Sequence, residues 1–66
     1  MIFLTVVEML ANDEALPHKY RDHILSGDWE NHRECHIKPD WLLIYKKNDV
    51  NQLILIRTGS HSELFS

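Results

Sequence analysis

Residues 41–58, WLLIYKKNDVNQLILIRT, contain two apolar runs separated by a short polar segment. The first run, WLLIYK (41–46), is apolar at successive positions, which is typical of a central strand covered on both faces. The polar residues 48–51 predict a hairpin loop, and QLILIRT (52–58) predicts the returning strand. The sequence therefore predicts an antiparallel strand pair at the centre of the fold.

The residues just before this pair predict a third strand. Residues 32–37 place two apolar side chains on one face and three polar ones on the other: Cys35 and Ile37 against His32, Glu34 and His36. Pro39 and Asp40 then predict a turn into the central strand. The result is a three-stranded antiparallel meander.

Residues 2–12 predict a helix. Apolar side chains recur at helical spacing at Phe3, Val6, Val7 and Leu10. Residues 11–13 and Pro17 end the segment. Apolar residues lie nearly all the way round this helix, so it must pack against other parts of a protein on more than one side. The β-branched residues of the same segment leave a strand as the alternative.

These elements together predict one small α+β domain over residues 1–66, with a helix in 1–14, a loop region in 15–31, and antiparallel strands with a short C-terminal tail in 32–66. Ordering a chain of this size costs about 100 kcal/mol, which burial of its core only about cancels. A partner surface is one way in which small chains make up the difference.

Composition narrows the classes of function. Ten acidic and seven basic residues give a net charge of −3, and this mild acidity by itself argues against nucleic-acid binding. The excess of acid lies in residues 1–14, and the remainder is neutral and contains all five histidines. The single cysteine, Cys35, excludes an intramolecular disulfide and favours a cytoplasmic location. The apolar residues 1–10 are too few to span a bilayer.

Two kinds of chemistry fit the cysteine and histidines poorly. A metal site built from His32, Cys35 and His36 is disfavoured, because Cys35 would point away from the face that the two histidines share. We therefore expect no metal and no cofactor. A cysteine nucleophile is also disfavoured, because Cys35 is expected to be buried in the middle of a strand.

Acid–base chemistry is a better match to the residue types. His36 and Asp40 lie around the first turn, and Arg57 and His61 lie at the end of the last strand. Cleavage of RNA needs a base for the 2′-OH, an acid for the 5′-oxygen and a cation for the phosphorane, which Arg57 can supply. Trp41 and Phe65 could stack an unpaired base. By spacing alone, the interpretation of these histidines as ordinary surface residues is favoured over a catalytic role.

Three stretches resemble a known family: LPHKYRDHILSGDW (16–29), RECHIKPDWLLIYK (33–46) and LIRTGSHSELF (55–65). In this order and spacing they are similar to the YafQ-type toxins of the RelE superfamily. The resemblance implies a RelE-like sheet with helices on one face. It also implies ribosome-dependent endonucleolytic cleavage of mRNA, without a metal and with the RNA 2′-OH as nucleophile.

The resemblance also assigns residues. The family's functional histidines and acid correspond to His23, His36, Asp40 and His61. His61 is the expected general acid, and Asp40 and His36 are expected to act on the 2′-OH or to orient the substrate. The remaining correspondences are to Arg57 at the phosphate and to Trp41 and Phe65 as aromatic residues lining the site.

Two departures accompany the resemblance. Family members have a strand and a first helix upstream of the part that matches here, so residues 2–12 correspond to the second helix of a hairpin. A Lys-Gly pair of the family is Glu30 and Asn31 in this chain, which weakens attraction to RNA phosphates. The expected partners are a cognate antitoxin, the ribosome and mRNA. The alternative is a catalytically silent module that binds an antitoxin or forms a homodimer through its uncovered helix.

Overall fold

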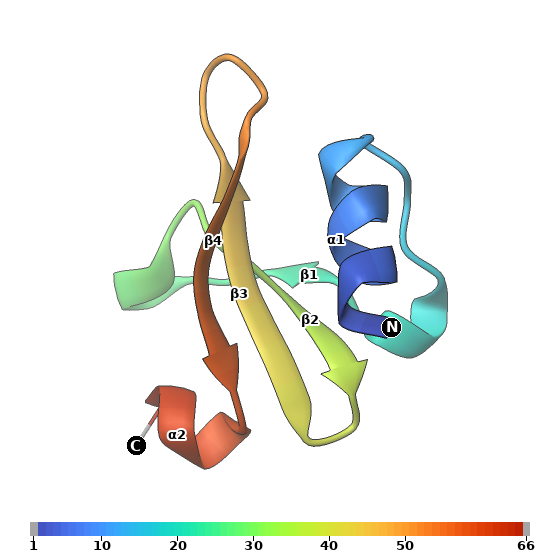
Figure 1. Cartoon of the computed structure of the whole chain (residues 1–66). Helices are drawn as coiled ribbons and strands as arrows, with labels where there is room; N and C mark the ends of the chain where they lie inside the picture. Colours follow the sequence, from blue (N-terminus) through green and yellow to red (C-terminus); the bar gives the residue numbers. More distant parts are fainter. Residues whose placement is uncertain (1, 66) are drawn as a thin grey trace.

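The computed structural model describes residues 2–65 and confirms an α+β fold with an N-terminal helix and an open antiparallel sheet (Figure 1). The helices and short 3₁₀ turns are α1 (Ile2–Ala11), η1 (His18–Tyr20), η2 (Gly27–Trp29) and α2 (His61–Phe65). The strands are β1 (His23–Ile24), β2 (Arg33–Lys38), β3 (Trp41–Lys47) and β4 (Leu53–Gly59), in the spatial order β1-β2-β3-β4.

The sheet has one strand more than the predicted meander. β1 lies inside residues 15–31, which were expected to form a loop, and it pairs antiparallel with β2 through His23 opposite Glu34. A strand of two exposed residues shows no alternation that a sequence pattern could reveal. This extra strand matters because it places His23 beside β2.

α1 ends one residue earlier than predicted, in a Schellman motif. The N–H of Glu14 donates to the carbonyl of Met9, and the N–H of Asp13 donates to that of Leu10. Asp13 has φ 63°, the left-handed conformation that this motif requires. Its carboxylate also accepts hydrogen bonds from Lys47 and Asn51, and these bonds attach the end of the helix to the β3–β4 hairpin.

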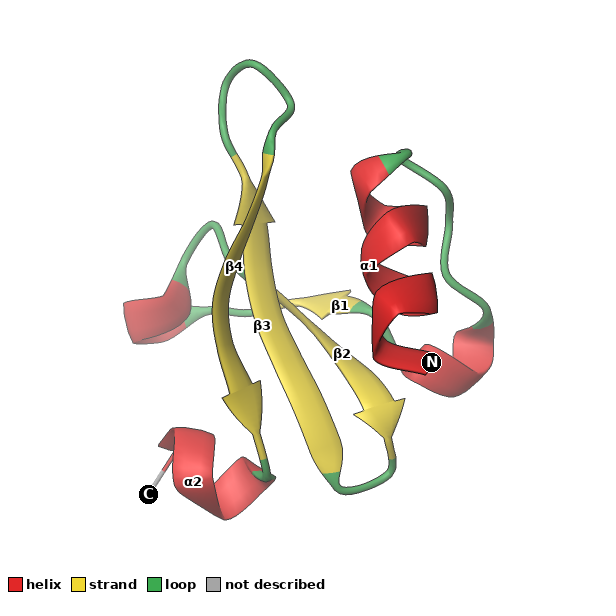
Figure 2. Cartoon of the chain, in the orientation of Figure 1, coloured by secondary structure: helices red, strands yellow, loops and turns green. Residues whose placement is uncertain are grey.

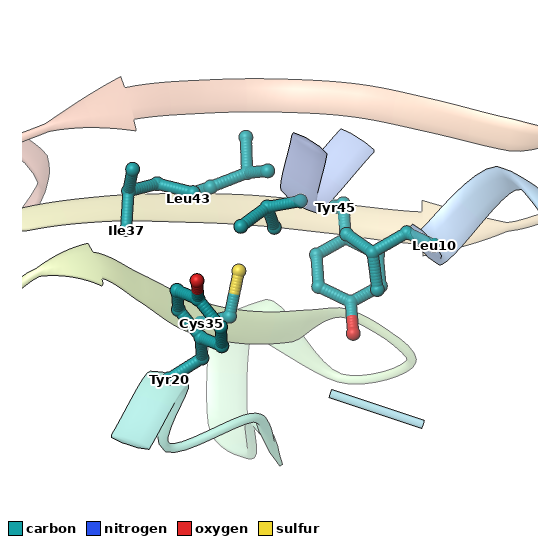
Figure 3. Close-up of a cluster of buried hydrophobic side chains, with 7 residues drawn as sticks. Leu10, Tyr20, Cys35, Ile37, Leu43 and Tyr45 are labelled. Carbon is teal, nitrogen blue, oxygen red and sulfur yellow. The ribbon is translucent and has the colours of Figure 1, made fainter. Parts of the chain in front are cut away.

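The sheet is covered on both faces, as the apolar run in β3 predicts. Alternate residues of β3 belong to two separate buried clusters, and Figure 2 shows helical elements on both sides of the strands. The helix-side cluster packs α1 against the sheet (Figure 3), and it consists of Val6, Leu10, Tyr20, Cys35, Ile37, Leu43 and Tyr45. The opposite cluster contains Leu42, Ile44 and Leu64, with Leu25, Trp29, Ile56 and Phe65 packed against it.

A β-bulge in β4 determines which face carries Arg57. Tyr45 pairs with Leu55, but the next residue, Ile44, pairs with Arg57, so Ile56 is an extra residue on β4. Without this insertion, Arg57 would lie opposite Leu43, on the side of α1. The bulge therefore moves the guanidinium to the face away from α1.

Within residues 2–65, no helix has the length and apolar character needed to cross a bilayer.

Candidate functional site

A row of side chains crosses the sheet on the face away from α1. His23 of β1 lies opposite Glu34 of β2, Glu34 lies opposite Ile44 of β3, and Ile44 lies opposite Arg57 of β4. Directly opposed residues in antiparallel strands project from the same face of the sheet. Two strand spacings separate Glu34 from Arg57, or roughly 10 Å. The row thus places an acidic group and a basic group on either side of the apolar Ile44.

Glu34 is the buried centre of the acidic group. Its residue is only 5% exposed, and its Oε1 lies 3.4 Å from Nε2 of His23 and 3.7 Å from Nε2 of His36. Its Oε2 is buried and accepts no hydrogen bond from any described residue. A buried carboxylate oxygen without a hydrogen bond costs free energy, so Glu34 is held at this position against its preference for water.

The two histidines beside Glu34 lie close together, with ring centroids 6.4 Å apart. Nδ1 of His23 lies 2.6 Å from the carbonyl oxygen of Arg21, which can only accept, so Nδ1 carries a proton. Nε2 of His23 therefore faces Oε1 of Glu34 at 3.4 Å, and the two histidine rings and the carboxylate form one cluster.

The basic group is organised around Trp29. The guanidinium carbon of Arg57 lies 5.3 Å from the centre of the Trp29 ring, within the range of a cation–π contact. Trp29 also meets the edge of Phe65, with ring centroids 6.3 Å apart, and Phe65 in turn lies 4.9 Å from the ring of His61. Arg57, Phe65 and His61 are therefore brought together through one tryptophan.

A capping box positions His61. Ser60 precedes α2, its backbone N–H donates to Oε1 of Glu63 at 2.7 Å, and its Oγ accepts from the N–H of Glu63 at 3.3 Å. The hydrogen bond from the Ser60 N–H, with that from its hydroxyl, lowers the pKa of Glu63. This reciprocal pair sets the first turn of α2 and therefore the direction in which His61 leaves β4.

The structure does not bring all of the predicted site residues together. Asp40 is exposed in the turn between β2 and β3. Trp41 lies on the helix side, where its ring stacks on Phe3 with centroids 5.5 Å apart, and its indole N–H donates to Oγ1 of Thr58 at 2.6 Å. Trp41 and Phe65 therefore lie on opposite faces of the sheet, because adjacent strand positions alternate between faces and Trp41 shares the face of Leu43.

Two residues of the arrangement were missed as site residues. Glu34 enters the sequence analysis only as one of the polar residues on one face of the strand 32–37. The signal was its spacing from His36, because residues two positions apart on a strand lie side by side on the same face. Trp29 enters the sequence analysis only as the last residue of the stretch 16–29. Its contacts with Arg57 and Phe65 depend on η2 folding against the sheet, which no local pattern predicts.

Cys35 is buried in the helix-side cluster, with no exposed surface. Burial, with the nearby charges of Asp22 and Glu34, raises the pKa of its thiol to about 12. A thiol with this pKa is not ionised at neutral pH and is no nucleophile. The same alternation separates Cys35 from His36, so these side chains do not share a ligand position. No set of three or more histidine, cysteine or acidic side chains within residues 2–65 is arranged to hold a metal ion.

Comparison with known proteins identifies the family of this chain. The family model described as the bacterial toxin of type II toxin–antitoxin systems, YafQ, matches residues 2–66. The mRNA interferase toxin YafQ of Escherichia coli is 46% identical over 57 residues, which make up 86% of this chain and 61% of that protein. The chain therefore spans about three fifths of the length of this curated relative.

Solved structures agree with the sequence match. A copper-bound mutant toxin from Helicobacter pylori superposes with a TM-score of 0.91 and 48% identity, covering 97% of this chain and 72% of that one. The E. coli DinJ–YafQ toxin–antitoxin complex gives a TM-score of 0.84 and 41% identity, covering 98% of this chain and 71% of the other.

Proposed function

This chain belongs to the YafQ family of type II toxin–antitoxin toxins, and on that basis we propose that it is an endoribonuclease that cleaves mRNA on the ribosome. The observation that supports the proposal most directly is the row from His23 through Glu34 to Arg57 across one face of the sheet. It supplies proton-transfer groups and a fixed cation on the same surface, which are the groups that transesterification of RNA requires.

The proposed reaction uses the substrate's own 2′-OH as nucleophile. A base removes the proton of the 2′-OH, the oxygen attacks the adjacent phosphorus, and the bond from phosphorus to the 5′-oxygen breaks. An acid then protonates the departing 5′-oxygen, leaving a 2′,3′-cyclic phosphate and a 5′-OH. Atoms and charge balance with no cofactor, and the proposal assigns every step to side chains.

His61 is the proposed acid and Arg57 the proposed cation. His61 stands at the first position of α2 beside Phe65, and Arg57 reaches the same region over Trp29. A base stacked on Phe65 or Trp29 would place its phosphate near both groups. Because the bulge at Ile56 holds Arg57 on this face, the cation is in place before substrate binds.

His36 is the proposed base at the 2′-OH, with Asp40 acting there or on the orientation of the substrate. His36 is half-buried at the end of β2, and its Nε2 faces Glu34. Glu34 touches no substrate in this scheme and is a positioning residue, which holds the rings of His36 and His23. Orientation of this kind matters because a misplacement of about 1 Å can reduce a rate about 100-fold.

A cognate antitoxin is the proposed protein partner, by analogy with the DinJ–YafQ complex, and the cytoplasm is the proposed location. The structural comparison supports the partner through the shared fold of the bound toxin. A catalytically silent module that binds an antitoxin, or pairs with a second copy of itself, is the competing function. A folded chain without nuclease activity would favour it.

Primer extension on translated mRNA tests the proposal. Cells expressing this chain without an antitoxin should stop growing and should show new mRNA 5′ ends within reading frames. His61→Ala should abolish both effects, and His18→Ala should leave both intact, because His18 lies in η1 and makes none of the site contacts. Arrest that persists in His61→Ala contradicts the assigned acid. No cleavage by a folded wild-type chain contradicts the nuclease itself.

A further inference from the structure

A recess of about 390 Å³ lies between η1 and the end of β2, next to His36. Its lining is partly apolar and partly basic. Ile2, Tyr20, Ile37 and Pro39 supply the apolar surface, and Lys19, Arg21 and Lys38 supply the cations. His36 borders both this recess and the carboxylate of Glu34, so the recess adjoins the proposed site.

The charge of this recess is unusual for a chain with a net charge of −3. Three of the seven basic residues line it, and its described lining contains no carboxylate. No carboxylate of residues 2–65 lies within 4.0 Å of Lys19, Arg21 or Lys38. Unpaired cations gathered at one recess attract an anion.

A larger recess, of about 880 Å³, which Tyr45 helps to line, provides the contrast. Two of its three basic residues are already paired, Arg33 with Asp22 and Lys47 with Asp13, and four carboxylates share its lining with Lys46: Asp13, Glu14, Asp22 and Asp49. Cations neutralised within the protein offer little to an external anion. The smaller recess is therefore the one equipped to bind a charged ligand.

The size and lining of the smaller recess favour a nucleotide. About 390 Å³ is at the lower end of ligand pockets, enough for one base and its sugar but not for a helix of a partner protein. Pro39 is exposed beside the recess, whereas Tyr20 is buried in the helix-side cluster and Nζ of Lys19 lies 5.2 Å from the centre of its ring. A positively charged groove that follows the backbone is one of the means by which proteins bind single-stranded nucleic acid.

We infer that this recess is a subsite for the RNA nucleotide next to the scissile phosphate, with its phosphate on Lys19, Arg21 and Lys38. The inference rests on the proposed nuclease function and extends it. Since His36 borders the recess, a nucleotide bound there continues directly into the position where the 2′-OH would be deprotonated. The subsite supplies attraction for RNA that the overall charge of the chain does not.

An NMR titration with a 2′-O-methylated RNA trinucleotide tests this, because the methyl groups prevent cleavage. We expect amide shifts at Tyr20, Arg21, Ile37 and Lys38. The triple variant Lys19→Gln/Arg21→Gln/Lys38→Gln should bind about 10-fold more weakly or worse, and each lost phosphate contact should reduce the salt slope by about 0.7. The matched control, Lys46→Gln, removes one positive charge from β3 and should change the affinity less than twofold. The same spectra report whether each variant is folded.

The outcomes separate the subsite from the nuclease. Equal affinity of the triple variant and the wild type, or an equal loss in Lys46→Gln, overturns the subsite even if mRNA is cleaved. Shifts at the recess in a chain that cleaves no mRNA support the subsite and contradict the nuclease. An acidic peptide, poly-glutamate, that shifts the recess while the trinucleotide does not would overturn the inference in favour of a protein ligand.

Discussion

Oε1 of Glu34 lies 3.4 Å from Nε2 of His23, and the pairing of the two-residue strand β1 with β2 sets the two residues opposite each other. Replacement of Glu34 by glutamine keeps the shape and removes the charge. We expect kcat for mRNA cleavage to fall by about 10- to 100-fold with little change in KM, because the histidine rings lose their orientation and not their contact with RNA. Cleavage kinetics in a translating extract measure both constants.

Two further variants sharpen this test. Glu34→Asp retains a carboxylate and should recover part of kcat, whereas Glu14→Gln removes an exposed acid and should have no effect. A folded Glu34→Gln chain that cleaves at the wild-type rate would remove Glu34 from the mechanism.

Substitutions of the two aromatic residues Trp41 and Phe65 should have different effects, the first on folding stability and the second on RNA cleavage. Trp41→Phe removes the hydrogen bond to Thr58 and part of the stack on Phe3, so it should lower the free energy of unfolding by about 1 kcal/mol and leave cleavage by the folded protein unchanged. Phe65→Ala should reduce cleavage more than any loss of folded protein explains. Urea denaturation beside a cleavage assay compares the two. Loss of cleavage in a stable Trp41→Phe protein would return Trp41 to the site.

The capping box formed by Ser60 and Glu63 should stabilise α2, the helix that begins with His61. Ser60→Ala removes the hydroxyl that accepts from the Glu63 N–H, and loss of such a cap costs about 1 kcal/mol. The low pKa of Glu63 has a linked effect: its contribution to stability is present above the unfolded value near 4.5 and is lost as pH falls below it. Amide exchange should therefore show α2 loosening in acid and in Ser60→Ala. Unchanged exchange at residues 61–65 would contradict the cap.

Alkaline pH should destabilise the chain through two buried groups. Burial raises the pKa of Cys35 to about 12, and burial with the hydrogen bond to Asp22 raises that of Tyr45. A pKa that is raised in the folded state contributes stability below the unfolded value, and the contribution is lost as pH rises above it. The contribution of these two groups to the free energy of unfolding should therefore be constant up to about pH 9 and decline above it, where the unfolded thiol and then the phenol ionise.

Thiol labelling provides an independent check of the same burial. Cys35 should react with Ellman's reagent in urea and fail to react in the native protein at pH 8, since it is inaccessible and protonated. Rapid labelling of the native chain would show that the helix-side cluster opens.

The sequence alone determined the central strands, the helix of the first residues and the family, because each depends on a local pattern: an apolar run, a helical period, or a motif with fixed spacing. It did not determine which face of the sheet each site residue occupies. An uninterrupted apolar run carries no alternation, so it does not show on which face of the sheet Trp41 lies. The folded structure places Trp41 on the same face as Leu43, in the cluster beneath α1.

Tertiary pairing decided the rest. The bulge at Ile56 reverses the face of Arg57, and bulges arise from the fit between strands and not from the residues of one strand. The short strand β1 exists only because β2 offers it hydrogen-bonding partners, and it brings His23 to Glu34. The residues of the candidate site could therefore be named from the sequence, whereas their division into an acidic and a basic group across Ile44 required the folded sheet.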